Sequence, residues 1–273
     1  MEALYTPLHA VEPQVRLLKT ESAQEHEPVR CSMEVVCLSE APRFTALSYV
    51  WGDENPQEAI LLNGHKKLVR VNLVNALRHV QAHWCKAFSN EESEDFSSWG
   101  DAICINQDDI LEKNYQVALM SSIYSRAELV ISWLGDSSAT ICLGLDTIQL
   151  VAEQTLNMTI EDFCSLQWME RHPSLHVGRT EFNSPFPYNA RWYSVFTLFA
   201  FPYWSTVWIF QEIALAQRLL FCNADLSLDY QDLASVTEKF WHFGEILRTS
   251  GLTRSDFLRG RHIWPKLYEE SSQ

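Results

Sequence analysis

A carboxylate set in an apolar, aromatic segment is the feature of this sequence most suited to chemistry. Glu212 ends the stretch over residues 204–212, and Trp204 and Trp208 precede it at helical spacing, so the three would share one helix face. A carboxylate in such surroundings must be paired, hydrogen-bonded or used, because burying an unpaired charge is costly. The segment therefore indicates either a catalytic glutamate or a structural one that pairs with an arginine or caps a backbone amide.

Residues 101–107 place an acid and two amides around a short apolar run. Residues 102–105 predict a buried strand, with Asp101 at its entrance and Asn106 and Gln107 at its carboxyl end. Ligands bind at the carboxyl ends of strands in open α/β sheets. The two amides are equally suited to binding a ligand and to serving as turn and helix-cap residues.

A third segment, residues 46–53, predicts a strand that runs into a sharp glycine turn. Taken alone, it would be an ordinary strand and turn with a tryptophan in the core. Its polar and aromatic groups are candidates for contacts with a ligand: Ser48, Tyr49, Trp51, Gly52 and Asp53.

Most common catalytic signatures are absent, because the sequence contains no GxGxxG, GxxxxGK[ST], HExxH or GxSxG motif. His79 and His83 lie four residues apart with Cys85 nearby, but no second pair of zinc ligands follows, and helical histidines are usually surface residues. We therefore predict no metal site. The seven cysteines form no CxxC pair, which favours reduced thiols.

The elements that must position these segments are short strands, followed by helices and strands in alternation. A helix is expected from Asn72, a second from Asp108, and residues 128–134 predict a buried strand. Parallel neighbours need crossover connections, normally helices, so this alternation predicts an α/β fold with a parallel sheet flanked by helices. The earlier expected strands cover residues 15–19, 29–38, 44–50 and 59–62.

The remainder of the chain predicts mainly helices. Residues 136–190 are expected to form a helical insertion, and aromatic helices around Pro202, a strand over 218–222 and a helix over 231–247 follow.

The length of 273 residues and a hydrophobic content of 47% allow one large domain. We expect a single domain over residues 1–248 and a polar C-terminal tail over 249–273.

The net charge of -14 produces a field that repels phosphate backbones, and no cluster of Lys and Arg reverses it locally. Nucleic acid is therefore not an expected partner. No secretory signal is recognisable, and the most apolar stretch, residues 195–210, is interrupted and too short to span a membrane. We expect a cytoplasmic protein without a membrane span.

Three segments, in this order, resemble the signature blocks of the heterokaryon incompatibility (HET) domain family: residues 46–53, residues 101–107 with 112–116, and residues 204–212. The resemblance extends from about Pro7 to about Leu220. The chain departs from the family pattern at Gly100, where the family has a β-branched or aliphatic residue, and at Thr206, where it often has arginine. The second departure removes a possible charge partner for Glu212.

HET domains resemble Toll/interleukin-1 receptor (TIR) domains, which implies a flavodoxin-like parallel sheet, here with an N-terminal β extension. Trp208 and Glu212 are similar to the Trp-x-x-x-Glu element, whose glutamate carries NAD+ glycohydrolase activity in enzymatic TIR domains. The resemblance therefore implies that Glu212 is catalytic and that NAD+ or a related nucleotide is the substrate, with no cofactor. It implies substrate contacts from Ser48, Tyr49, Trp51, Gly52, Asp53, Asp101, Asn106, Gln107 and Trp208.

The resemblance also implies a role in fungal programmed cell death and innate immunity, triggered by recognition of non-self. A homo-oligomer and an upstream recognition protein or domain are then expected as partners. Two other interpretations remain: a non-enzymatic, self-associating adaptor, and a module that binds a nucleotide without turning it over.

Overall fold

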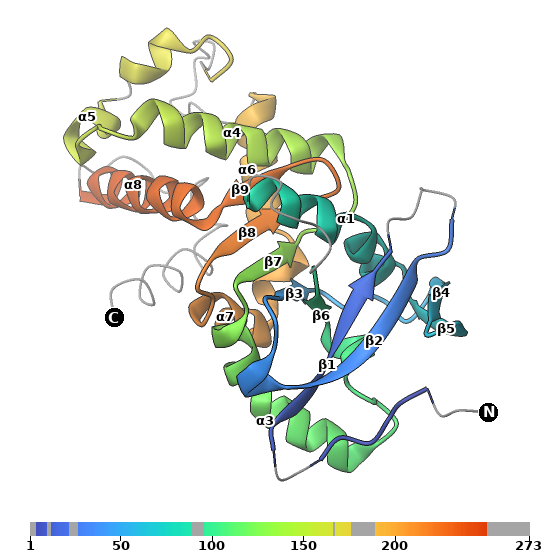
Figure 1. Cartoon of the computed structure of the whole chain (residues 1–273). Coiled ribbons are helices and arrows are strands. Elements are labelled where there is room, and N and C mark those ends of the chain that lie inside the picture. Colours follow the sequence, from blue (N-terminus) through green and yellow to red (C-terminus); the bar gives the residue numbers. More distant parts are fainter. Residues whose placement is uncertain are drawn as a thin grey trace. The chain divides into compact units, whose positions relative to one another are not determined.

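The chain divides into two compact units in the computed structural model, whose elements are labelled in Figure 1. The first unit comprises Met1–Asp136 and Thr206–Ala224, and the second comprises Ser137–Ser205 and Asp225–Gln273. The expected polar tail lies outside the described residues, apart from Thr249. The structure describes residues 4–9, 12–21, 27–88, 96–165, 167–175 and 189–249.

Parallel strands form the centre of the first unit. β3 (Thr45–Tyr49) pairs with β6 (Ser98–Trp99) on one side and with β7 (Leu129–Trp133) on the other, and β7 pairs with β8 (Leu219–Cys222), all in parallel. Every residue of β3, β7 and β8 is buried, as expected of strands that are covered on both faces. The predicted α/β class is thus confirmed, and β3 and β7, two of the strands predicted between residues 44 and 134, pair in parallel.

Antiparallel strands extend this sheet beyond β6, so the sheet is mixed and not parallel throughout. β1 (Gln14–Thr20) pairs antiparallel with both β6 and β2 (Arg30–Cys37). β4 (Gln57–Leu62) joins β2 in parallel and forms a hairpin with β5 (His65–Arg70). The prediction omitted β5. The full order in this unit is β5-β4-β2-β1-β6-β3-β7-β8.

Helices cover the two faces of the central strands (Figure 1). α1 (Val71–Ala87) packs on the face to which Leu47 points, because Leu47 and Leu73 of α1 both approach Gly100. The neighbouring residue of β3, Ser48, faces the other side, where α3 (Ile110–Arg126) and α7 (Val207–Ala214) lie in contact. The sequence alternation of strands and helices therefore produces helices on both faces.

One predicted strand is wrong. Residues 102–105 do not form a strand, because α2 (Asp101–Cys104) is a helical turn in which the amides of Ile103 and Cys104 donate to the Gly100 carbonyl at 3.1 and 2.8 Å. A short apolar run suits a buried helical turn as well as a strand. Asp101 consequently lies at the carboxyl end of strand β6, and not at the entrance of a strand.

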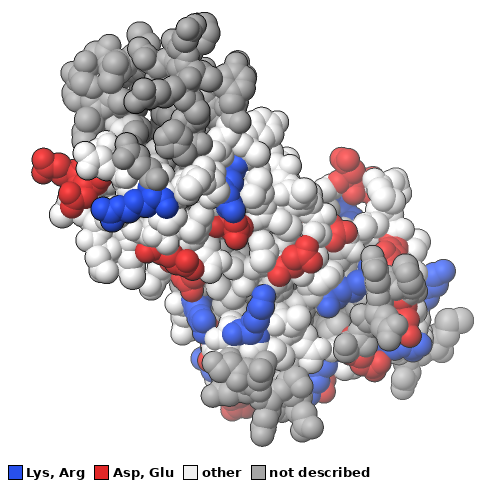
Figure 2. All heavy atoms as spheres, turned by 90° about the horizontal axis from the view of Figure 1, so that it is seen from above, with Lys and Arg blue, Asp and Glu red and all other residues white. Residues whose placement is uncertain are grey.

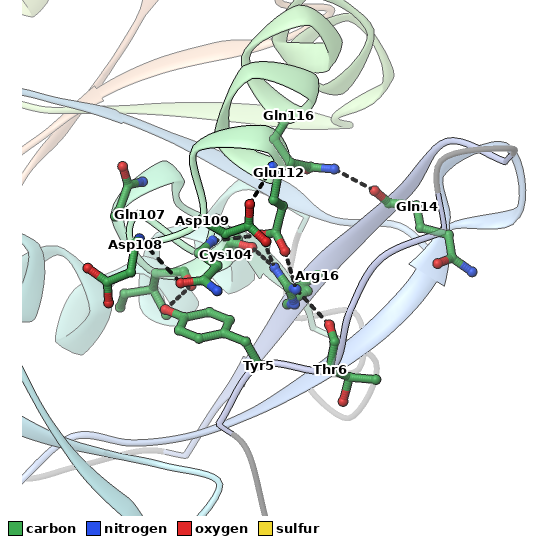
Figure 3. Close-up of polar contacts among 12 residues, drawn as sticks. Tyr5, Thr6, Gln14, Arg16, Cys104, Gln107, Asp108, Asp109, Glu112 and Gln116 are labelled. Atoms are coloured by element: carbon green, nitrogen blue, oxygen red, sulfur yellow. Dashed lines mark hydrogen bonds and ion pairs between the residues drawn. The ribbon is translucent and has the colours of Figure 1, made fainter.

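A buried ion pair joins the N-terminal strands to α2 and α3 (Figure 3). The guanidinium of Arg16, on β1, has no exposed surface and makes two hydrogen bonds to Glu112 of α3, at 2.6 and 2.8 Å. It also donates to the carbonyls of Cys104, at 3.0 Å, and Thr6, at 2.7 Å. The backbone amide of Asn106 donates to the same Glu112 carboxylate at 2.7 Å, so the pair holds the turn between α2 and α3.

Helices dominate the second unit, as predicted. α4 (Ala139–Thr155) packs closely on α6 (Ala190–Phe199), where the Ser194 carbonyl lies 3.0 Å from the position that a Cβ at Gly144 would occupy. The ring of Trp192 meets that of Phe240 edge-on. The predicted helix over 161–169 is split in two, and the predicted loop over 172–188 lies outside the described residues from 176 onward. The other elements are α5 (Ile160–Cys164), η3 (Gln167–Arg171), η4 (Pro202–Ser205), β9 (Ser227–Asp229) and α8 (Tyr230–Thr249).

Charged side chains of both signs are interspersed on the face drawn in Figure 2, where no continuous basic surface is visible. In the described part of the chain, no helix combines the length and the apolar character needed to cross a membrane.

Glu112→Gln should destabilise the fold by about 3–5 kcal/mol, because it leaves the buried Arg16 cation without a counter-charge. Urea denaturation measures this loss. The matched control is Glu128→Gln, which breaks the exposed pair with Arg43 and should cost about 0–1 kcal/mol. Equal losses for the two variants would show that the buried pair is not a major constraint.

Candidate functional site

The carboxyl end of β3 is a topological switch point of the parallel strands. From β3 the chain reaches β6 by way of α1 on one face, and from β6 it reaches β7 by way of α3 on the other. Ligand sites of open α/β sheets lie outside the carboxyl ends of strands at such points. Six side chains meet here and are called the carboxylate cluster: Ser48, Tyr49, Trp51, Asp101, Tyr124 and Glu212.

α7 carries Glu212 into the cluster. Its buried residues are Ile209, Glu212 and Ile213, which form one stripe of the helix. Only 6% of Glu212 is exposed, and its carboxylate is hydrogen-bonded to the hydroxyls of Ser48 and Tyr124. Its buried Oε2 has no hydrogen-bond partner among the described residues. The site therefore contains a buried carboxylate oxygen whose hydrogen-bonding capacity is unused within the described part of the chain.

Asp101, the second acid, is held by three donors. Its Oδ1 accepts from the Tyr49 hydroxyl at 2.9 Å and from the Ala102 amide at 2.7 Å, and its Oδ2 accepts from Trp51 Nε1 at 2.9 Å. Burial raises the pKa of Asp101, while these hydrogen bonds oppose the rise. Asp101 is therefore oriented by the strand and loop that end at the switch point.

The two acids interact electrostatically. Burial, which disfavours the charged form, raises the pKa of Glu212 from 4.5 to about 7, and the negative charge of Asp101 contributes in the same direction. The hydrogen bond from Ser48 acts against these effects. Glu212 is thus poised to exchange a proton near neutral pH, as is typical of functional carboxylates.

Tyr124 was not predicted as a site residue. Its buried hydroxyl, on α3, donates to the Leu47 carbonyl at 2.9 Å and also interacts with Glu212. Burial raises its pKa, and the negative charge of Glu212 adds to the rise. A buried tyrosine needs a partner for its hydroxyl, which is the one signal in the sequence that could have indicated this role.

Two further residues that the prediction missed support the loop after β3. Asn72, on α1, donates to the Val50 carbonyl at 2.7 Å and accepts from Trp133 Nε1 at 3.0 Å. Arg70, at the end of β5, donates to the Gly52 carbonyl at 2.7 Å. Gly52 has a φ of 72°, a conformation that glycine adopts at low cost, so this turn requires it.

Three further residues that were predicted to contact a ligand lie outside the carboxylate cluster. Gln107 lies beside the cluster, because its Nε2 donates to the Asp101 carbonyl at 2.9 Å. Asn106 is the turn residue that one interpretation foresaw, since its Oδ1 accepts from the Asp108 amide at 3.3 Å. Asp53 is exposed on the loop.

The prediction that Trp204, Trp208 and Glu212 share one helix face is only partly correct. Trp204 belongs to η4, which ends before α7 begins, so only Trp208 and Glu212 share the helix. Thr206, between these two elements, has an extended backbone with φ -87° and ψ 119°, so the helical spacing does not continue through it. Trp208 is 53% exposed, whereas Glu212, one turn later, is buried.

The histidines considered as zinc ligands have structural contacts. His79 stacks on Trp133, with 5.6 Å between ring centroids, and its Nδ1 lies 2.8 Å from the Asn75 carbonyl. His83 Nε2 lies 2.7 Å from the Asn223 carbonyl. Within the described ranges, no three His, Cys, Asp or Glu side chains are grouped so that they could hold a metal ion.

The family model described as heterokaryon incompatibility protein (HET) matches residues 44–212, more than half of the chain. The chain belongs to the HET family. Its similarity to heterokaryon incompatibility protein 6, OR allele, of Neurospora crassa is 32% identity over 148 residues, which cover 52% of this chain and 22% of that protein. The chain therefore spans about a fifth of the length of this relative. No solved structure matches.

The region matched by the HET model contains the whole carboxylate cluster. It begins at Phe44, directly before β3, and ends at Glu212. All three sequence segments that resemble the HET blocks therefore contribute: the first supplies Ser48, Tyr49 and Trp51, the second supplies Asp101, and the third supplies Glu212.

The pKa of Glu212 predicts a pH-dependent stability. Because the pKa in the folded protein, about 7, exceeds the ordinary 4.5, the associated stabilisation is complete below about pH 4.5 and is lost as the pH rises through about 7. Relative to Glu212→Gln, whose side chain stays neutral, the wild type should lose on the order of 2 kcal/mol between about pH 5 and about pH 8.

Urea denaturation of both proteins across this pH range measures the difference. Glu54→Gln, which neutralises an exposed carboxylate on the loop after β3, is the matched control and should track the wild type. A constant difference between the wild type and Glu212→Gln would contradict the assigned shift.

Proposed function

We propose that this HET domain acts in fungal incompatibility and cell death by cleaving NAD+ to nicotinamide and ADP-ribose, with Glu212 as the catalytic residue. The observation that carries the proposal is the buried Glu212 carboxylate, with one unpartnered oxygen, beside a second acid at the switch point of the sheet. Such placement of a titratable group is typical of an active site.

The strand order supports a TIR-like, flavodoxin-like core. In chain order β3 is the first parallel strand, β6 the second, β7 the third and β8 the fourth, so the sequence of strands across the sheet is second, first, third, fourth. This matches the beginning of the flavodoxin-like order. The strand order therefore agrees with the resemblance of Trp208 and Glu212 to the Trp-x-x-x-Glu element of TIR domains.

The cluster has the chemistry that this reaction requires. The glycosidic bond between ribose C1′ and the nicotinamide nitrogen breaks with its electron pair going to nicotinamide, which leaves as a neutral molecule and needs no proton donor. One carboxylate can therefore suffice, whereas enzymes that hydrolyse ordinary glycosides use two. Water adds to C1′ and releases a proton to solvent.

Glu212 would act in its ionised form. Its Oε2 would accept a hydrogen bond from a ribose hydroxyl, and the charge would stabilise the oxocarbenium-like transition state, an effect worth a few kcal/mol in a site that excludes water. Asp101 adds a second negative charge beside the developing cation. Trp208 is sufficiently exposed on α7 to stack on the base.

The role in incompatibility rests on family membership and on the similarity to the Neurospora protein. We accordingly propose an upstream recognition partner that brings copies of this domain together.

Purified protein at high concentration should release nicotinamide from NAD+, and Glu212→Gln should abolish the release, because the neutral amide cannot stabilise the oxocarbenium charge. Chromatographic detection of nicotinamide measures it, with Glu54→Gln as the control that should keep wild-type activity. Release by Glu212→Gln at the wild-type rate would contradict the catalytic role. Saturable NAD+ binding without product would favour a nucleotide-binding module.

The rate of NAD+ cleavage should rise with pH through about 7, since the carboxylate must be ionised and its pKa lies there. Initial rates over about pH 5 to pH 9 measure the acid limb of the profile. A rate that falls over this range would indicate that the protonated form acts, which the proposed mechanism excludes.

A self-associating adaptor is the second candidate. Large apolar side chains are exposed at the start of two neighbouring helices, namely Val207 and Trp208 on α7 and Ile110 and Leu111 on α3, and association between copies would bury them. Val207→Lys should then lower the solution mass measured by light scattering and abolish cell death, while Glu212→Gln retains both. Loss of cell death by Glu212→Gln with unchanged solution mass would favour the enzyme.

A further inference from the structure

We propose that Arg70 is the phosphate-recognition residue of this site, where its guanidinium binds the pyrophosphate of the dinucleotide substrate. This inference rests on the proposed NAD+ cleavage. The sequence offers no glycine-rich phosphate loop, so the negative charge of the substrate must be met by a side chain or by isolated amides.

Contacts with the loop that follows β3 position Arg70. Its Nη1 donates to the Gly52 carbonyl at 2.7 Å, and its Cζ lies 5.1 Å from the centre of the Trp51 ring. The same Trp51 donates to Asp101 Oδ2. A chain of contacts from Arg70 through Trp51 to Asp101 therefore places the guanidinium beside the carboxylate cluster.

The signs of the charges suit the substrate, which has phosphates and a cationic nicotinamide ribose. The ring of Trp51 contacts the Arg70 guanidinium, and its Nε1 donates to the Asp101 carboxylate, so the cation and the acid lie against one side chain. The two acids would attract the cationic nicotinamide ribose, and Arg70 would attract the phosphate. A ligand with both charges is thus bound in one orientation, with its scissile bond at Glu212.

Arg70 has unused binding capacity. No carboxylate in the described part of the chain forms an ion pair with it, whereas Arg16, Arg43 and Arg78 are paired with Glu112, Glu128 and Glu58. A guanidinium carries five N–H donors, and the bond to Gly52 uses one. The planar fork of the remaining donors suits the oxygens of a phosphate.

Lys113 of α3 is the competing cation, because its charge also acts on Asp101. Its side chain is exposed, and no hydrogen bond of the described residues connects it to the loop after β3. Arg70 is the better candidate because its guanidinium is held in place before a ligand arrives, so less conformational entropy is lost on binding.

Substrates with and without phosphate test the assignment. Arg70→Gln should raise the KM for NAD+ and for nicotinamide mononucleotide by about tenfold to hundredfold, with a much smaller change in kcat. An increase of this size corresponds to the loss of hydrogen bonds to a charged group. The KM for nicotinamide riboside, which has no phosphate, should change far less. Arg70→Lys should fall between the two, since it keeps the charge and loses the fork.

Lys66→Gln is the matched control, because it removes the same charge from an exposed position on the same hairpin. Equal increases in KM for all three substrates would mean that Arg70 only supports the loop, and this would overturn the assignment. An unchanged KM for NAD+ in Arg70→Gln, or an effect found instead in Lys113→Gln, would overturn it as well.

Failure of the proposed function is distinguishable from failure of this inference. If the wild type releases no nicotinamide from any substrate, calorimetric titration with ADP-ribose and with adenosine still tests Arg70. Tighter binding of ADP-ribose that disappears in Arg70→Gln would support phosphate recognition without cleavage. Equal binding of the two ligands, or no binding of either, would overturn it.

Discussion

The buried ion pair between Arg16 and Glu112 is the interaction on which the arrangement of the first unit depends. Removing both charges from water is costly, and the pair is tolerated because the guanidinium also reaches the carbonyls of Cys104 and Thr6. These contacts join β1, the N-terminal segment, the end of α2 and the start of α3. Because α2 begins at Asp101, an interaction outside the carboxylate cluster helps to set the position of one of its acids.

In the carboxylate cluster, hydrogen bonds offset part of the repulsion between two buried acids. Two carboxylates are buried close enough to repel each other, and the donors Ser48, Tyr49 and Trp51 offset only part of that cost. A bound cation would relieve the repulsion, and in the proposed mechanism the positive charge that would develop at the ribose has this effect. Arg70 lies against the ring of Trp51, and under the proposed phosphate recognition it would bind the substrate while the acids keep their charge.

Strands such as β3, β7 and β8 could be predicted from the sequence because their apolar runs and bounding turns are local features. β6 was not predicted, because a strand of two residues leaves no such run. The parallel pairing of β3 with β7 was expected from the helices that lie between them in the chain. The helical turn at Asp101 could not be predicted in this way, since four apolar residues fit either structure and the choice depends on Gly100, where β6 has just ended. β5 was missed because its residues are mostly polar, and its pairing with β4 depends on the turn at Asn63 and Gly64.

The sequence by itself determined the class of fold, the membership of the HET family and the segments that carry Glu212, Asp101 and the end of β3, because motifs and periodicity are properties of neighbouring residues. Only the tertiary structure brought Tyr124 to Glu212, placed Arg70 over Trp51 and paired Arg16 with Glu112. These contacts join residues far apart in the chain, and their distances are set by how the sheet and its helices pack. The raised pKa of Glu212 has the same origin, because burial and the nearby charge of Asp101 exist only in the folded protein.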